Sequence, residues 1–330
     1  MFHDLVDKSE GCQFNRWTYD LHKVVQLARA RDAQVQRDAQ LQVPKALNLT
    51  AVVFHESRCG STLVANSLIG MNPEQHRTYS ESAPPAMAIK NVCGSDYDRC
   101  SIDQAAMVLR DAMYLMSRTN DPKEERVFFK MQSVTTQNIE VFQMAYPDVP
   151  FMFVYRSPVE VMMSHFKDGM NHANCVRSKR FAPKVVRKIA ARRGYSNAES
   201  MESEDYCAAH LASITESAVA ALKVSENGYP VNYKTLPESL YEDILPAMGV
   251  KVGPEEIERI KTVSGKYSKG RGGKAGEFKG DSEQKKAAAS PQVKKAAATF
   301  LQESFDMLES YSKQLDLGGT DENDGDGNVL

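Results

Sequence analysis

Short apolar runs alternate with amphipathic stretches along most of the chain. The runs at 51–54, 126–130 and 151–155 have the length of strands, and the last is apolar throughout, as is typical of a strand buried on both faces. Further short strands are expected at 76–81 and 230–233. Strands that alternate with helices at this spacing predict an α/β fold, a central parallel sheet of about five strands with helices on both faces.

Apolar residues three or four positions apart predict the helices between these strands. The first of them, stopped by Pro44, predicts an N-terminal helical extension over 1–45, before one large domain at 46–315. Between 167 and 200 the regular pattern gives way to a basic insertion that we expect to be irregular. The helices are expected at 12–40, from 61 to 68, from Pro84 onward, and at 102–116, 138–145, 157–164, 204–222, 236–248 and 296–315.

Composition narrows the class of protein. At 330 residues, 42% hydrophobic and 25% charged, the chain is typical of a soluble globular protein. It has no apolar run of 18 residues, so no transmembrane segment is expected, and its first residues lack the pattern of a signal peptide. We therefore expect a cytoplasmic protein, with the lumenal domain of a truncated Golgi-type enzyme as the alternative.

Charge is unevenly distributed along the chain. The tail at 316–330 contains five acidic residues and no basic one, which predicts an acidic disordered segment. The insertion at 167–200 contains nine lysines and arginines, which fit either an anionic acceptor or a solvated basic helix. No stripe of alternating aromatic and basic residues is present, so nucleic-acid binding is not expected.

The six cysteines contain no C-x-x-C pair, so a structural zinc site is not expected, and we find no other metal-ligand spacing. Cys93 and Cys100 are near enough in the sequence to bridge a small loop. Free thiols in a reducing compartment are the favoured interpretation. The cysteines are Cys12, Cys59, Cys93, Cys100, Cys175 and Cys207.

A strand, a glycine-bearing turn and a helix start follow one another at 51–68. The turn contains Arg58 and Gly60, and Ser61-Thr62 opens the helix. Unpaired backbone N–H groups and the helix dipole meet at such a point and bind phosphate. The nucleotide-kinase loop G-x-x-x-x-G-K-[ST] is not matched, because its first glycine and its lysine are absent. The segment thus predicts a P-loop-type fold that does not carry out ordinary ATP chemistry. The alternative interpretation of 51–68 is a helix with an ordinary cap and no bound phosphate.

Charged residues follow the other strands at the same edge of the predicted sheet. Glu81 follows the second strand, Lys130 ends the third, and Arg156 follows the fourth. Ligands of open α/β sheets bind at the carboxyl ends of the strands. With Arg58, these residues predict a pocket for a polyanionic ligand that contains one carboxylate as a base.

Four motifs together resemble the sulfotransferase family that uses 3′-phosphoadenosine-5′-phosphosulfate (PAPS). Ser57–Leu63 is similar to the family's 5′-phosphosulfate loop, and 153–164 to its 3′-phosphate motif, an arginine at a strand end with a serine eight residues later. Residues 231–233 resemble its adenine-side segment. The late glycine-rich loop matches at 269–279, where Phe278 replaces a tryptophan.

The resemblance is to the bacterial-type and tyrosylprotein-sulfotransferase-like branches, in which a glutamate after the second strand is the base. The cytosolic enzymes for small molecules have Lys-x-His after the third strand, and here Gln132 takes the place of that histidine. The resemblance implies transfer of the sulfuryl group from PAPS to a hydroxyl or amine, leaving 3′-phosphoadenosine-5′-phosphate (PAP), without a metal. The rival bases are His55, His165 and His172.

The residue roles are also carried over from the family. The resemblance implies Glu81 as general base, with Arg58 and Lys130 beside the transferred group and the leaving phosphate. It leaves open whether the acceptor is a small metabolite, a glycan or a peptide, and the oligomeric state. The donor-binding residues implied are Arg58, Cys59, Gly60, Ser61, Thr62, Arg156, Ser164, Tyr233, Arg271 and Gly273.

Two other functions remain open at this level. The first is a P-loop kinase for a nucleotide or small molecule, which magnesium-dependent ATP hydrolysis would reveal. The second is a catalytically inactive, sulfotransferase-like scaffold that binds a nucleotide or an anionic polymer.

Overall fold

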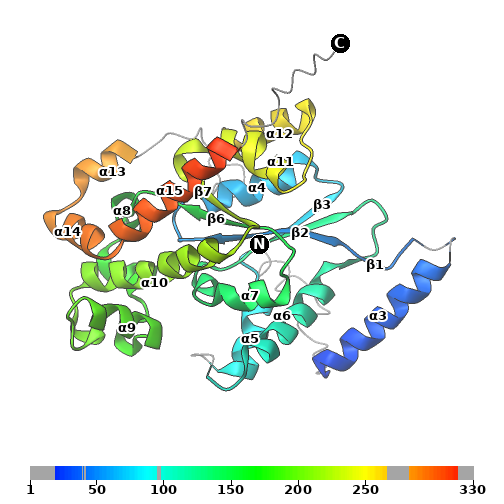
Figure 1. The fold of residues 1–330 in the computed structure, drawn as a ribbon, viewed down its shortest axis with the longest axis horizontal. Coiled ribbons are helices and arrows are strands. Elements are labelled where there is room, and N and C mark those ends of the chain that lie inside the picture. Colours follow the sequence, from blue (N-terminus) through cyan, green and yellow to red (C-terminus); the bar gives the residue numbers. More distant parts are fainter. Residues whose placement is uncertain (1–18, 39, 41, 95–97, 266–281, 319–330) are drawn as a thin grey trace, which may run out of the picture.

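The computed structural model describes residues 19–38, 40, 42–94, 98–265 and 282–318. Its centre is a five-stranded sheet in the order β3-β5-β2-β6-β7, and every neighbouring pair is parallel (Figure 1). This confirms the predicted α/β fold with a parallel sheet of about five strands. The strands are β2 (Asn48–His55), β3 (His76–Ser80), β5 (Arg126–Lys130), β6 (Phe151–Tyr155) and β7 (Gly228–Asn232).

Both faces of the sheet are buried, which explains the apolar strands. Along β2, Ala51 and Val53 belong to one hydrophobic cluster, whereas Val52 and Phe54 belong to another on the opposite face. Side chains alternate between faces along a strand, so helices must cover both sides.

The helices form two layers, above and below the sheet in Figure 1. One layer contains α4 (Ser61–Met71), α8 (Pro158–Phe166), α12 (Pro254–Ser264) and α14 (Pro291–Phe300). The other contains α5 (Pro84–Cys93), α6 (Ile102–Ser117) and α7 (Ile139–Ala145). Helix α15 (Gln302–Gly318) packs beside β7 and contributes residues to the second cluster. The long helix α10 (Ser203–Val224) contributes residues to both clusters.

The N-terminal helix lies outside these layers. The helix predicted over 12–40 is described from Leu21 to Arg37 as α3, and it packs on α6. Asp32 of α3 accepts a hydrogen bond from Arg118 Nη2 at 2.7 Å. A short antiparallel pair, β1 (Lys45–Ala46) with β4 (Arg118–Thr119), joins this helix to the sheet domain and was not predicted.

Three predicted segments differ from the structure. The insertion contains a regular helix, α9 (Lys184–Arg192), whose apolar side is buried. The helix predicted at 236–248 is present at 238–247, but it contains a π-helical turn (Leu240–Ile244) before the short α11 (Leu245–Ala247). Pro246 lacks the N–H group that a regular helix needs there. The single closing helix is two, α14 and α15, since the chain passes from one hydrophobic cluster to the other near Leu301.

The preference for free thiols was wrong for four cysteines. Cys93 is bonded to Cys100 and Cys175 to Cys207, each pair with Cα atoms 4.8 Å apart. The second pair joins residues that only the tertiary fold brings together, so sequence spacing did not reveal it. Cys59 is a free, buried thiol, and Cys12 lies outside the described residues. Among the helices of the described ranges, none is both long and apolar enough to cross a membrane.

Candidate active site

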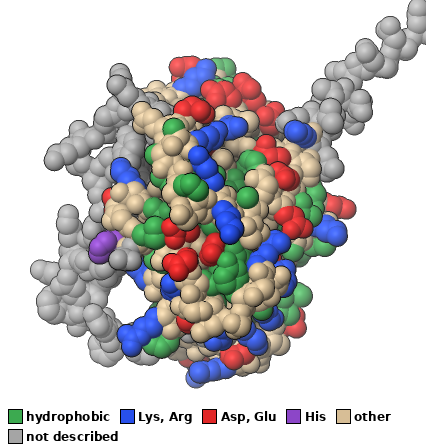
Figure 2. Space-filling view, turned by 90° about the vertical axis from the view of Figure 1, so that its left-hand side faces the viewer, with side chains coloured by type: hydrophobic (Ala, Val, Ile, Leu, Met, Phe, Trp, Pro, Cys, Tyr) green, Lys and Arg blue, Asp and Glu red, His purple; other side chains and the backbone are tan. Residues whose placement is uncertain are grey.

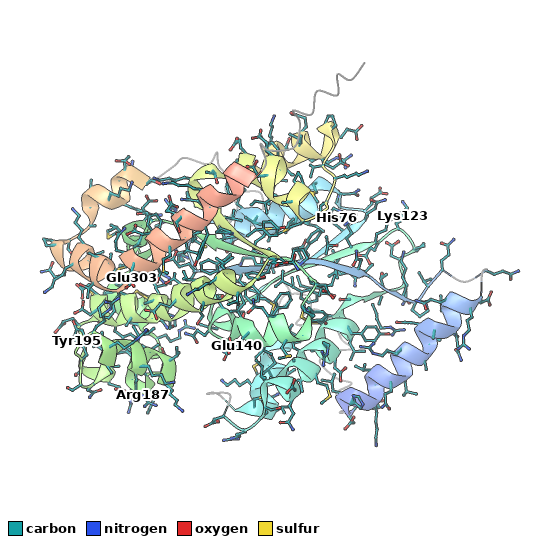
Figure 3. All side chains as sticks on the ribbon, viewed as in Figure 1. His76, Lys123, Glu140, Arg187, Tyr195 and Glu303 are labelled. Carbon is teal, nitrogen blue, oxygen red and sulfur yellow. A yellow bond between two sulfur atoms is a disulfide. The ribbon has the colours of Figure 1, made fainter. Side chains whose placement is uncertain are left out.

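A cavity of about 960 Å³ lies at the carboxyl edge of the sheet. Segments that follow all five strands contribute to its wall, because parallel strands end at one edge. His76, the first residue of β3, and Lys123 lie at the opposite edge from α9, so they mark the amino ends of the strands (Figure 3).

The loop between β2 and α4 has the backbone shape of an anion-binding turn. Ser57 (φ 76°), Arg58 (φ 54°) and Gly60 (φ 92°) all have left-handed backbone conformations. Such conformations are unfavourable for residues other than glycine and occur mainly at functional sites. No side chain caps the start of α4, and Ser61 and Thr62 there line the cavity. The N–H groups of this first turn are thus placed to bind an anion.

Arg58 connects this loop to α8. Its Nε donates hydrogen bonds to the carbonyl oxygen and to Oγ of Ser164, both at 3.2 Å. Both residues line the cavity, so the predicted pair of Arg58 and Ser164 is brought together. Ser164 holds the guanidinium at the cavity wall.

Arg156 is held from several sides at the end of β6. Its Nε donates to Glu160 Oε2 at 2.5 Å and its Nη2 to Ser282 Oγ at 3.0 Å, and its guanidinium lies 4.1 Å from the ring centroid of Tyr233. Burial favours a higher pKa for Glu160, but hydrogen bonds from Arg156 and Ser282 outweigh it and lower the pKa. The sequence analysis missed Glu160 and Ser282, although the i,i+4 spacing of Arg156 and Glu160 is a signal for such a pair.

The ring of Tyr233 lies over Gly60, which gives a test of this packing. A Cβ atom added at Gly60 would lie 2.3 Å from Tyr233 Cδ2, whereas one added at Gly194, also at positive φ, would meet no atom within 4 Å. Both changes to alanine strain the backbone by ~1 kcal/mol. Gly60→Ala should also displace Tyr233 and Arg156 and weaken anion binding by ~10–100-fold, the loss expected for a charge-assisted hydrogen bond.

The comparison of Gly60→Ala with Gly194→Ala requires thermal unfolding of both variants and calorimetric binding of PAP. Equal binding by the two variants would show that the contact between Gly60 and Tyr233 does not matter for the ligand.

Glu81 and Lys130 form an ion pair beside the cavity. Lys130 Nζ donates to Glu81 Oε1, and Glu81 has a left-handed backbone with φ 56°. The side chain of Glu81 is 50% exposed and lines the cavity, whereas that of Lys130 is 1% exposed and lies behind it. Glu81 is therefore accessible to a ligand, and Lys130 positions it.

His55 is poorly suited to the role of base. Its Nδ1 accepts a hydrogen bond from the backbone N–H of Ser57 at 3.1 Å, and its Nε2 lies 3.0 Å from the carbonyl oxygen of Met131. That pattern assigns the proton to Nε2. Nε2 is also 3.6 Å from Glu81 Oε1, so His55 supports the carboxylate.

The loop between β2 and α4 contains two buried acidic groups, the carboxyl group of Glu56 and the thiol of Cys59. Burial raises the pKa of Glu56 to about 8, although the N–H of Arg156 donates to its carboxyl group at 3.2 Å and acts in the opposite sense. Burial likewise raises the pKa of the Cys59 thiol to about 12, and this thiol donates to the carbonyl oxygen of Val154. Cys59 is fully buried and is not among the described residues that line the cavity, so its part in donor binding stays a prediction. Glu56 was not predicted.

The structure brings most of the predicted site together. Arg271 and Gly273 lie outside the described residues. In the described part of the chain, no group of three or more His, Cys, Asp and Glu side chains is placed to hold a metal ion. Cavity residues that the sequence analysis did not identify include Lys90, Asn174, His210 and Lys285, whereas Lys167 and Arg177 belong to the basic insertion that it singled out.

No protein-family model matches the chain, and no curated protein matches it. Solved structures with a similar fold include sulfotransferase STF1 from Mycobacterium tuberculosis H37Rv, with 12% identity and a TM-score of 0.43 over 85% of this chain and 81% of that one. A sulfotransferase from Alicyclobacillus acidocaldarius has 13% identity and a TM-score of 0.42, over 81% and 96% of the two chains. The sulfotransferase domain of the Synechococcus PCC 7002 olefin synthase has 10% identity and a TM-score of 0.37, over the same shares. All three are sulfotransferases, the family whose motifs this sequence resembles, but at TM-scores below 0.5 we base the function on the geometry of the site.

Proposed function

We propose that this chain is a sulfotransferase that uses PAPS. The observation that carries the proposal is the meeting, in one cavity, of a left-handed anion-binding loop, a fixed arginine beside an aromatic ring, and an accessible glutamate. The first two suit a nucleotide with phosphates at two places, and the third suits a base that acts on an acceptor.

The residues present fit the donor. A cavity of about 960 Å³ is large enough for a nucleotide and part of an acceptor. Ser61, Thr62 and the first turn of α4 would bind the 5′-phosphate. Arg156, with Ser164 nearby on α8, would bind the 3′-phosphate, and the ring of Tyr233 would lie on the adenine side.

The donor, when bound, supplies a sulfuryl group whose bond to the 5′-phosphate oxygen breaks as a bond to the acceptor forms. Glu81 takes the proton that the acceptor hydroxyl or amine loses, which makes the acceptor a better nucleophile. Arg58, fixed by Ser164, places a positive charge where negative charge develops.

The geometry supports one role for Lys130, and a second role stays a prediction. As a positioning residue, it holds the carboxylate of Glu81 through their ion pair. Contact between Lys130 and the leaving phosphate, as the family resemblance implies, requires the ammonium to turn from Glu81 toward the donor.

Calorimetric binding of PAP tests the donor assignment. PAP should bind well, AMP should bind at least ~10-fold more weakly because it lacks the 3′-phosphate, and Arg156→Ala should weaken PAP by ~10–100-fold, as expected for one charge-assisted contact. ATP with magnesium tests the kinase alternative in the same experiment.

Arg77→Ala is the matched control for Arg156→Ala. Arg77 also pairs with a glutamate, Glu124, but lies at the start of β3, away from the cavity. Its loss should lower stability without changing PAP affinity. Equal affinity for PAP and AMP, or preference for ATP with magnesium, would contradict the proposal.

We also propose that the chain matures in an oxidising compartment, the lumenal alternative to a cytoplasmic one. The pairing of Cys93 with Cys100 and of Cys175 with Cys207 supports this, because structural disulfides are rare in reducing compartments.

A further inference from the structure

The charged residues of the cavity wall are mostly basic. Among the described residues that line it, Glu81 is the single carboxylate, against six lysines and arginines. A wall of this kind attracts anions, and its field is focused inside a cavity. The basic residues are Arg58, Lys90, Arg156, Lys167, Arg177 and Lys285.

Three of the six are not needed by the donor as proposed. Arg58 and Arg156 lie with the donor-binding motifs, and Lys285 lies on α13 (Ser282–Ala288), which supplies the Ser282 partner of Arg156. The other three lie on the α5 side or in the insertion. Within the described part of the chain, no side-chain hydrogen bond or ion pair engages them. They are Lys90, Lys167 and Arg177.

Lys90 lies on the face of α5 that lines the cavity. Ala83, Ala86, Met87 and Lys90 all line the wall, at the three- and four-residue spacing of one helix face. Seven residues of helix rise about 10 Å from Ala83, which follows Glu81 closely, to Lys90. An acceptor along this face would thus meet the base at one end, the apolar Met87 next, and a cation beyond it.

Arg177 lies on a wall that is fixed to the core. The 3₁₀ turn η3 (Asn174–Val176) precedes it, and Cys175 in that turn is bonded to Cys207 of α10. The next residue, Ser178, is hydrogen-bonded to Tyr206 at 3.0 Å. The guanidinium of Arg177 therefore extends from a backbone held on both sides, which limits the entropy lost on binding a ligand.

The other basic residues of the insertion serve different purposes. Arg192 pairs with Glu216, and Arg193 with Glu303 at 3.4 Å. Arg187 lies on α9 at the outer edge of the molecule (Figure 3). On the face shown in Figure 2, basic and acidic side chains are interspersed. Of the nine basic residues of the insertion, Lys167 and Arg177 are thus the two that line the cavity.

We infer that the acceptor itself carries a negative group, a carboxylate or an existing sulfate or phosphate, bound by Lys90, Lys167 and Arg177. This inference rests on the proposed function and adds the substrate class to it. The acceptor is then an anionic compound whose nucleophile is a hydroxyl or an amine.

Two fluorescent probes that differ in one charge provide the test. 4-Methylumbelliferyl β-D-glucuronide has a carboxylate where 4-methylumbelliferyl β-D-glucoside has a hydroxymethyl group. Their binding is measured by fluorescence anisotropy, with and without saturating PAP. The glucuronide should bind at least ~10-fold more tightly, the effect of one or more charged contacts, and the difference should shrink as salt is added.

Matched triple variants show which charges are responsible. Lys90→Gln, Lys167→Gln and Arg177→Gln together should abolish the preference for the glucuronide and leave PAP affinity within ~2-fold of the wild type, because the donor contacts are intact. Lys184→Gln, Arg187→Gln and Lys188→Gln remove equal charge from α9 and should preserve the preference. Calorimetry and thermal unfolding show that both triple variants are folded.

The results separate the two proposals. Absence of PAP binding would overturn the donor assignment, whatever the probes do. Equal binding of the two probes, no binding of the glucuronide, or the same loss in both triple variants would overturn the anionic acceptor. A matching loss of PAP affinity in the first variant would place its three residues in the donor site and would also overturn the inference.

Discussion

Replacing Glu81 by glutamine should slow sulfuryl transfer by ~10²–10⁴-fold, the usual contribution of a general base. Glutamine keeps the shape of the side chain but cannot accept the proton of the acceptor. PAP affinity should stay near that of the wild type, since the donor contacts come from other elements. Single-turnover rates with saturating PAPS, together with calorimetric PAP binding, measure the two effects separately.

Loss of stability must be distinguished from loss of the base. Glu81→Gln leaves the ammonium of Lys130, with a side chain only 1% exposed, beside a neutral partner, which destabilises the fold by ~1–3 kcal/mol. The double variant Glu81→Gln, Lys130→Met removes the buried charge and should recover stability but not turnover. Full turnover by Glu81→Gln would rule out Glu81 as the base.

Replacing Glu56 by glutamine should stabilise the protein, and increasingly so as the pH rises. Burial raises the pKa of Glu56 from 4.5 to about 8 in the folded state. Its favourable contribution is complete below the unfolded pKa and is lost as the pH rises through the folded pKa, because the unfolded chain releases the proton first. Across this window the gain in the glutamine variant should approach ~5 kcal/mol, at about 1.36 kcal/mol for each pKa unit.

Denaturant unfolding of the wild type and Glu56→Gln at pH 5, 6.5 and 8 measures this gain. PAP affinity gives an independent readout, since ionised Glu56 under the loop would repel a phosphate. The wild type should lose PAP affinity above about pH 8, and the variant should not. A stability difference that does not change with pH would show that Glu56 is ionised in the folded protein. Glu140→Gln is the control, because that carboxyl group lies away from the cavity and its pKa is also raised by burial.

The sequence revealed the parts of the site that depend on local order. A strand, a turn with Arg58 and Gly60, and a helix opened by Ser61 and Thr62 follow one another directly, so their arrangement is set within a dozen residues. The parallel sheet implied that all strands end at one edge. That inference alone predicted that Glu81 and Arg156 line the same cavity, as they do.

The contacts that distinguish these residues depend on tertiary packing. Lys130 ends β5 and Arg156 directly follows β6, yet Lys130 is buried behind Glu81. No pattern in the chain separates a buried lysine from an exposed one at this position. In the sequence, Glu56 has the character of an ordinary polar loop residue, and its burial becomes evident only in the fold. Ser282 reaches Arg156 from 126 residues away. Contacts of this kind are determined by the packing of the helices on the sheet and cannot be inferred from local sequence.

The bond between Cys175 and Cys207 has a practical consequence for anyone who prepares this protein. A strong thiol reductant in the lysis buffer, or expression in a reducing host, would remove the covalent link between η3 and α10 and loosen the backbone next to Arg177. The donor residues on the β2 loop, α4 and α8 do not depend on this bond. Material made in this way would retain a nucleotide in calorimetry and yet give false negatives in an acceptor screen. Periplasmic or secreted expression is the preparation in which a substrate library should be tried first.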